Sequence, residues 1–126
     1  MLQDTELKRF IEAYRDALAR GPRALAELYA EPCVTVHQGV VRVHATREEA
    51  ERCFAETDTG YRARGFSHGD IRTVSIEPFG ANGAVAIVRW AYLGACEELL
   101  WKATCAYTLH RHDGAWRIVA EMLHDA

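Results

Sequence analysis

The stretch HDGAWRIVAEMLH, residues 112–124, decides the fold of this chain. Its Asp113-Gly114 pair lies between two runs of alternating apolar residues, a strong hairpin signal because glycine accepts the positive φ of the turn. Residues 99–110 and 115–123 are therefore predicted to be paired strands, and residues 84–93 are predicted to be a third strand beside them. The chain thus ends in a long antiparallel sheet.

The first part of the chain has helical periodicity instead. Apolar side chains recur at helical spacing over residues 5–20, which predicts an amphipathic helix. Gly21-Pro22 ends this helix and starts a second one, since proline is tolerated in a first helical turn, and Pro32 ends the second helix. The buried side of the second helix is expected to consist of Leu25, Leu28 and Tyr29.

Between these helices and the final sheet, the pattern predicts short strands at residues 33–37 and 40–44. A capping box at residues 46–49 begins a third helix, and residues 71–79 form a further strand. This order predicts an α+β protein in which three helices pack on the concave side of a curved mixed or antiparallel sheet. A sheet of this shape is suited to enclose a cavity, so a pocket is the expected place for function.

Composition narrows the class of protein. With 126 residues, 49% of them hydrophobic and 26% charged, and with neither repeats nor a linker, the chain is expected to form one domain over residues 1–126. A net charge of -3 argues against nucleic acid as a partner, because phosphate binding needs clustered Lys and Arg. Neither a membrane-spanning apolar run nor a leader pattern is present, which predicts a cytoplasmic protein without a membrane partner.

The cysteines, histidines and glycines of this chain do not show the spacings that are typical of metal or cofactor sites. The four cysteines, Cys33, Cys53, Cys96 and Cys105, form no Cys-x-x-Cys pair and are expected to be free thiols that serve as small buried side chains. His110-Arg111-His112 lacks a nearby Cys or carboxylate set at ligand spacing, so no metal site is expected. A glycine-rich phosphate loop is also lacking, and no cofactor is predicted.

Three segments carry a resemblance to a known family: residues 14–21, 25–30 and 111–121. With the order of elements, they resemble the nuclear transport factor two-like superfamily, which includes the SnoaL-like and ketosteroid isomerase-like proteins. The resemblance spans nearly the whole chain and implies a cone-shaped fold. It also implies self-association as a homodimer. This scaffold hosts isomerases, dehydratases, cyclases and binding modules, so the resemblance leaves activity open.

Strand parity predicts which side chains of the hairpin face the cavity. If residues 112–114 form a three-residue loop, odd positions on the two strands share a face. That face would carry Trp101, Cys105, Tyr107 and Glu121 and would line the pocket. The opposite face is small and uncharged, as expected for packing on a second copy of the chain, and consists of Thr104, Ala106, Thr108, Ile118, Ala120 and Met122. A two-residue turn would reverse this assignment.

Glu121 is the first catalytic candidate. A carboxyl group on an otherwise apolar face is desolvated, which favours acid–base chemistry near neutral pH. The alternative is a structural ion pair with Arg89 or Arg117, or contact with solvent.

The resemblance suggests two further catalytic residues. His37 falls close to the position of the general-base carboxylate of ketosteroid isomerase-like proteins, and Tyr14 falls near their phenol oxyanion donor. The alternatives are a surface histidine before the Gln38-Gly39 turn and a core tyrosine. Tyr107 lies near that family's second acid, which is absent, so the full isomerase set is not present.

Trp90, Tyr92 and Trp101 are expected to shape the cavity, and Cys105 is expected to line it. Tyr14, His37, Trp101, Tyr107 and Glu121 are expected to converge on this cavity, between the first helix and the sheet. The sequence therefore predicts a pocket for a small apolar ligand, with general acid–base chemistry of the isomerase, dehydratase or cyclase type. The alternative is a non-enzymatic ligand-binding or dimerisation module. Whether the protein is an enzyme stays open at this stage.

Overall fold

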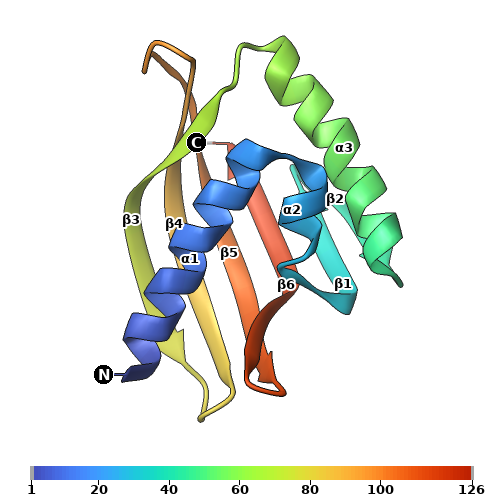
Figure 1. Cartoon of the computed structure of the whole chain (residues 1–126), viewed down its shortest axis with the longest axis vertical. Helices are drawn as coiled ribbons and strands as arrows, with labels where there is room; N and C mark the ends of the chain where they lie inside the picture. Colours follow the sequence, from blue (N-terminus) through green and yellow to red (C-terminus); the bar gives the residue numbers. More distant parts are fainter. Residues whose placement is uncertain (1, 126) are drawn as a thin grey trace.

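The computed structural model describes residues 2–125, which form one curved sheet and three helices (Figure 1). The helices are α1 (Leu2–Arg20), α2 (Pro22–Ala26) and α3 (Arg47–Ala63). The strands are β1 (Tyr29–His37), β2 (Val40–His44), β3 (His68–Pro78), β4 (Gly83–Leu93), β5 (Leu99–His112) and β6 (Ala115–Asp125).

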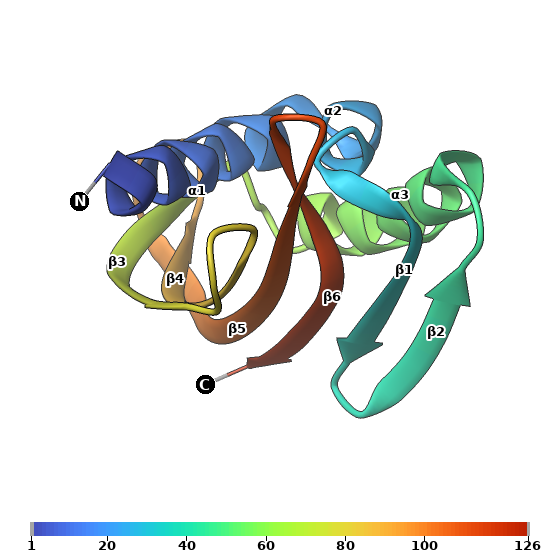
Figure 2. The same ribbon diagram turned by 90° about the horizontal axis from the view of Figure 1, so that it is seen from below.

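The sheet is mixed and has the strand order β2-β1-β6-β5-β4-β3. All neighbouring strands are antiparallel except β1 and β6, which run parallel. The sheet curls strongly, and the helices lie on its concave side (Figure 2). The α+β class predicted from the order of elements is confirmed, with the helices on the predicted side.

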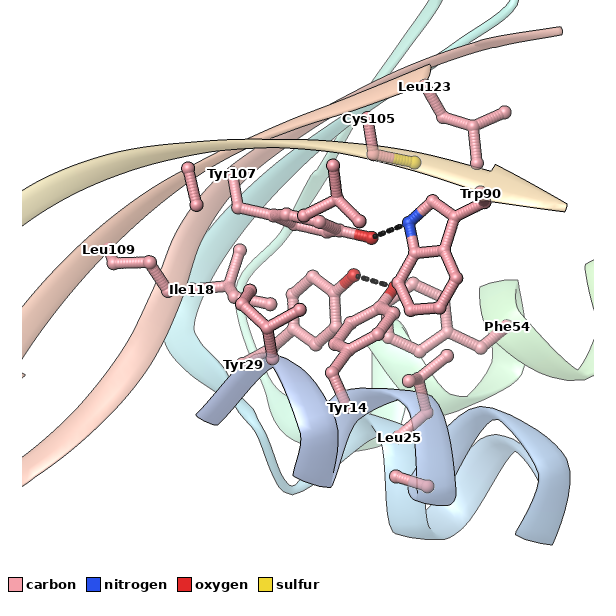
Figure 3. Packing of buried hydrophobic residues seen from close by; sticks show 14 of the residues in the cluster. Tyr14, Leu25, Tyr29, Phe54, Trp90, Cys105, Tyr107, Leu109, Ile118 and Leu123 are labelled. Carbon is pink, nitrogen blue, oxygen red and sulfur yellow. Dashed lines mark hydrogen bonds between the residues drawn. The ribbon is translucent and has the colours of Figure 1, made fainter. Parts of the chain in front are cut away.

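The core fills the space between the helices and the sheet (Figure 3). The apolar stripe of α1 faces inward, and its residues Leu7, Ile11 and Tyr14 are at most 4% exposed. They meet alternate residues of β4 and β5, such as Trp90 and Tyr107, which are also buried. Alternate burial along these strands is the pattern of a sheet that is covered on one face.

The predicted capping box is present at the start of α3. The Thr46 hydroxyl accepts a hydrogen bond from the backbone N–H of Glu49 at 3.2 Å. The Glu49 carboxylate accepts from the backbone N–H of Ala45 at 2.6 Å, one residue earlier than in the usual box. These bonds satisfy free N–H groups near the beginning of the helix.

The hairpin between β5 and β6 differs from the three-residue loop expected from the sequence. His112 pairs with Ala115, so the turn consists of Asp113 and Gly114 alone, with φ values of 52° and 77°. Two consecutive positive φ values are the signature of a type I′ turn, whose twist matches that of the strands. The three-residue prediction was wrong.

A β-bulge then restores the predicted parity. Thr108 pairs with Ala120 but Leu109 pairs with Ile118, so Val119 is an extra residue in β6. Beyond the bulge, Tyr107 lies opposite Glu121, as odd-to-odd pairing predicts. Before the bulge the parity is reversed: Ile118, which the sequence predicts on the outer face, is fully buried in the core.

The second helix is shorter than predicted. It ends at Ala26, and Tyr29 is the first residue of β1 rather than part of a helix. Pro32 lies inside β1, in the irregular segment where the pairing with β6 shifts between Tyr29 and Val34. A proline is accepted there because it lies where the ladder is interrupted. Strand β3 begins at His68, earlier than expected.

Candidate functional site

A cavity opens between α1, α2, α3 and the concave face of the sheet. It holds about 460 Å³ of empty space, part of it open to solvent. Its polar lining consists of Tyr14, His37, Thr57, Asp58 and Glu121, and the rest of its wall is mainly apolar. The apolar wall includes Leu18, Pro22, Leu25, Phe54, Tyr61, Tyr92 and Leu123. A mostly apolar cavity with a few convergent polar groups is the usual form of a small-molecule site.

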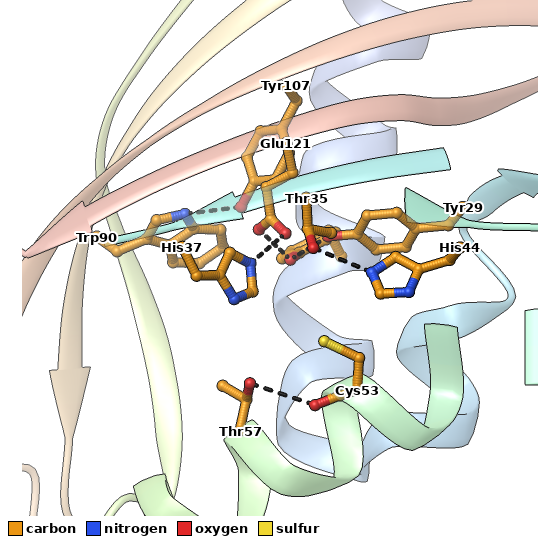
Figure 4. A network of polar contacts seen from close by, with 10 residues as sticks. Tyr29, Thr35, His37, His44, Cys53, Thr57, Trp90, Tyr107 and Glu121 are labelled. Carbon is orange, nitrogen blue, oxygen red and sulfur yellow. Dashed lines mark hydrogen bonds and ion pairs between the residues drawn. The ribbon is translucent and has the colours of Figure 1, made fainter. Parts of the chain in front are cut away.

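Glu121 is the polar centre of this cavity, although its side chain is only 2% exposed. One carboxylate oxygen, Oε1, lies 2.9 Å from Nε2 of His37 (Figure 4). The other, Oε2, accepts a hydrogen bond from the Tyr14 hydroxyl at 3.1 Å. Parallel pairing of β1 with β6 creates this contact, since Thr35 lies opposite Glu121 and His37 lies opposite the next inward-facing residue, Leu123.

Two tyrosines extend the network behind Glu121. The hydroxyls of Tyr14 and Tyr29 are 2.9 Å apart. Because Tyr14 donates its single proton to Glu121, Tyr29 is the donor in this second bond. Burial raises the pKa of both phenols well above 10.0, and the nearby Glu121 carboxylate raises each further. Both tyrosines therefore stay protonated and hold the carboxylate in place.

His37 is the one member of this group that reaches the rim, with a side chain that is 22% exposed. A carboxylate only accepts, so Nε2 carries the proton and donates it to Glu121. The other ring nitrogen, Nδ1, points toward α3 (Figure 4) and has no hydrogen-bond partner within residues 2–125. In the neutral ring it carries a free lone pair, the arrangement of an oriented base.

The structure thus brings together the three predicted catalytic residues, Glu121, His37 and Tyr14. Tyr107 lies just behind them, with its ring centroid 5.0 Å from that of Tyr14, and its hydroxyl accepts a hydrogen bond from Nε1 of Trp90 at 3.1 Å. Both are fully enclosed in the core and form the wall behind the lining of the cavity (Figure 3).

Two other predicted lining residues lie farther from the cavity surface. Cys105 is fully buried in the core and is not part of the lining. Trp101 packs against Tyr61 and Tyr92, while the guanidinium of Arg64 lies 3.8 Å from the centroid of its ring. Any effect of these two residues on a ligand therefore acts through the shape of the wall.

The sequence reasoning missed several residues of the site. Tyr29 was assigned to a helix, so its bond to Tyr14 was not expected. Thr57 and Tyr61 also line the cavity; Tyr61 was predicted only as an apolar position of the third helix, and Thr57 had no sequence signal. Tyr92, which the sequence predicts to shape the cavity, does lie in its lining. A second buried polar pair, the Thr35 hydroxyl and Nε2 of His44 at 3.0 Å, also lacked a sequence signal. Desolvation lowers the pKa of His44, which therefore favours the neutral form.

All four cysteines are free thiols in the described part of the chain. Cys33, Cys53 and Cys105 are buried as expected, but Cys96 is exposed between β4 and β5. Across residues 2–125, no group of three or more His, Cys, Asp or Glu side chains is placed to hold a metal ion. In the same range, no helix has the length and apolar character needed to cross a membrane.

The family follows from the sequence match, and the fold agrees with it. The chain belongs to the family described as NTF2-like protein (DUF6841), whose model matches residues 4–126. This confirms the resemblance inferred from the helix and hairpin segments. No protein of curated function matches the sequence.

Solved structures show the same fold at low identity. A protein provisionally described as a dehydratase of the NTF2-like family, from Streptomyces avermitilis, is 15% identical, with a TM-score of 0.74 and coverage of 99% of this chain and 97% of that one. The yeast Ubp3-associated protein Bre5 is 14% identical, with a TM-score of 0.76 over 95% of this chain and 93% of its own. An NTF2-like protein with a cystatin-like fold from Novosphingobium aromaticivorans is 17% identical, with a TM-score of 0.76 over 96% and 80%.

Proposed function

We propose that the cavity binds a small, largely apolar molecule and that His37 acts there as a general base. The reaction class is proton transfer at carbon, of the isomerase, dehydratase or cyclase type. The observation that carries the proposal is the buried Glu121 carboxylate, bonded to His37 on one side and to Tyr14 on the other.

The energetic cost of this arrangement supports a functional role. Burying a carboxylate costs several kcal/mol, and apolar residues of similar volume often stabilise a fold at least as well as a buried ion pair. Most of the core around Glu121 is apolar or aromatic, and Thr35 and His44 are the other buried polar residues near it. A carboxylate that both fixes the orientation of an imidazole and leaves the other ring nitrogen at a cavity is the pattern of an activated base.

The proposed step is removal of a proton from a carbon next to a carbonyl group. The C–H bond breaks, its electron pair forms the enolate, and the proton moves to Nδ1 of His37. The resulting imidazolium is stabilised by the negative charge of the Glu121 carboxylate, 2.9 Å away. Return of the proton to the same or another carbon, or loss of a leaving group, completes exchange, isomerisation or dehydration.

The hydroxyl that stabilises the enolate oxygen is proposed to come from another lining tyrosine. The hydroxyl proton of Tyr14 is already donated to Glu121, so Tyr14 orients the Glu121 carboxylate and is not the donor to the substrate. Tyr61 and Tyr92 also line the cavity, and burial raises the pKa of both phenols. A protonated phenol in a site of low dielectric is an effective donor to a developing oxyanion.

Deuterium exchange tests this proposal directly, because it follows the proton and needs no identified product. Phenylacetone and 2-tetralone are incubated in D₂O with the protein, and loss of the α-proton signal is followed by NMR. We expect exchange above the buffer rate, reduced roughly 100-fold or more in His37→Gln and Glu121→Gln, the range typical of general base catalysis. His68→Gln is a matched control, because His68 makes the same 2.9 Å contact with a carboxylate, that of Glu97, on the surface.

Equal exchange rates with the wild-type protein and the His37 variant would contradict a base at this position. Saturable binding of the ketones without exchange would instead favour the alternative, a ligand-binding module that is not an enzyme. Circular dichroism of each variant separates loss of the base from loss of the fold.

We also propose that the protein forms a homodimer through the convex face of its sheet. Two rows of uncharged residues cross five strands there in direct register. The first row is Val41, Val36, Met122, Ala106 and Ile87, and the second is Val43, Val34, Ala120, Thr108 and Val85. Val41, Val43 and Met122 are more than half exposed. A two-fold copy would bury these rows without bringing like charges together.

A cytoplasmic location is part of the same proposal. It is supported by the free cysteines, since thiols stay reduced in that compartment.

A further inference from the structure

A second cavity lies beside the first, between β1, β2 and α3. It holds about 430 Å³ of empty space, part of it open to solvent. His37 and Thr57 line both cavities, so the imidazole stands where the two meet. Because Nδ1 of His37 points toward α3, the lone pair of the proposed base is directed at this junction (Figure 4).

The two cavities differ in chemistry. The first is walled mainly by Leu, Phe and Tyr side chains, whereas the second is lined by Thr35, Arg42, Glu56 and Thr57 with only Val40 and Cys53 as its less polar members. A molecule that occupies both therefore needs an apolar body and a polar head group, with the reacting carbon between them at His37.

Arg42 is the single cationic side chain in the lining of the two cavities apart from histidine. It lies opposite Thr35 in the β1–β2 ladder and thus projects from the same concave face as His37. Its guanidinium contacts one carboxylate, Oε2 of Glu56, through Nη1 at 3.5 Å. The side chains of Arg42 and Glu56 are 51% and 73% exposed, so water and salt screen this contact and it is weak.

This weak pair favours an anionic head group over a cationic one. A guanidinium has five N–H donors in a planar fork, and only one of them is used by Glu56. An incoming carboxylate can take two of the others, while the more exposed Glu56 turns into solvent at little cost. A cationic head group would instead be repelled by the positive charge of Arg42.

We propose that the substrates of this site are small carboxylates with an apolar body, whose carboxylate is bound by Arg42 in the second cavity. The apolar body lies in the first cavity, and the carbon that loses its proton lies near Nδ1 of His37. This inference rests on the proposed function for its chemistry, but it makes a separate statement about binding.

The test compares phenylacetate with its neutral amide, 2-phenylacetamide, by isothermal titration calorimetry. We expect the wild-type protein to bind phenylacetate at least about tenfold more tightly, because bidentate charge-assisted bonds exceed neutral ones by that amount or more. Arg42→Gln should abolish the preference, and Glu56→Gln should strengthen phenylacetate binding by removing the competing carboxylate. Arg72→Gln is the matched control, since Arg72 is also 51% exposed and pairs with Asp70 at 3.3 Å on β3.

Equal affinity for acid and amide, or a preference that survives Arg42→Gln, would overturn the proposal. The measurement needs no turnover. Arg42-dependent binding of phenylacetate without any deuterium exchange would therefore uphold the carboxylate site and reject the base, while exchange of neutral ketones without acid preference would do the reverse.

Discussion

Replacing Glu121 with Gln is the most informative single change in this protein. The amide has nearly the shape of the carboxylate but is neutral and has only one acceptor oxygen. Tyr14 donates to one position and requires that oxygen, so the amide NH₂ has to face His37 and donate to Nε2. His37 then keeps its place, but its proton moves to Nδ1 and the lone pair at the cavity is lost.

The effect on stability is expected to be small. A hydrogen bond to a charged group exceeds a neutral one by about 1 kcal/mol, so the two bonds of Glu121 lose roughly 2 kcal/mol together. The lower desolvation cost of a neutral amide offsets this loss. The free energy of unfolding should therefore change by less than about 2 kcal/mol, or roughly 8 °C in Tm for a domain of this size. Glu121→Ala, which leaves two donors unpaired, should cost about 3–5 kcal/mol.

The assay is long-range ¹H–¹⁵N NMR of the imidazole, which reports the proton on each ring nitrogen, combined with thermal unfolding. At a pH where the ring signals show the neutral form, the wild-type protein should carry the proton on Nε2 and Glu121→Gln should carry it on Nδ1. Glu97→Gln, at the exposed His68 pair, is the control for stability. An unchanged His37 tautomer in Glu121→Gln would refute the orienting role of Glu121, whatever its effect on activity.

Four further outcomes are expected. Burial raises the pKa of all five tyrosines above 10.0, so only the unfolded chain loses phenolic protons as the pH rises past 10, and stability should fall there. Tyrosinate absorbance should appear only together with loss of circular dichroism. Ionisation of tyrosines in the native protein would contradict this. The lowered pKa of His44 means that the unfolded state binds a proton more readily than the native state, so stability should decrease as the pH falls through 6.5. The decrease in stability with pH should be smaller in His44→Gln. It should be as steep as in the wild-type protein in the exposed control, His112→Gln. Light scattering should give about twice the 14.2 kDa of one chain, and Met122→Glu should yield monomers that stay folded; a wild-type monomer at micromolar concentration would remove the dimer proposal. Thiol titration should count four cysteines after denaturation but only the exposed Cys96 reacting rapidly in the native protein, and a denatured count of two would indicate a disulfide.

Much of the fold could be predicted because its signals are local. The helical stripe that carries Tyr14, the capping box at Thr46 and the Asp113-Gly114 turn each depend on residues close together in the chain, and all three are present. Strand parity correctly predicted that Glu121 lies on the same face of the sheet as Tyr107, although it assumed the wrong turn length and no bulge. A shorter turn and an extra residue at Val119 each reverse parity, and together they cancel.

The site itself depends on contacts that no local pattern encodes. His37 and Glu121 are 84 positions apart and meet only because β1 enters the sheet parallel to β6. Strand periodicity alone does not specify that pairing. The bulge at Val119 likewise had no sequence signal, and Ile118 beside it is buried in the core. The sequence by itself determined which residues could form helices, strands and turns, because spacing and backbone preference act over a few residues. Tertiary structure alone decided that a buried carboxylate, a histidine and two tyrosines share one network, because burial and hydrogen bonding depend on every element packed around them.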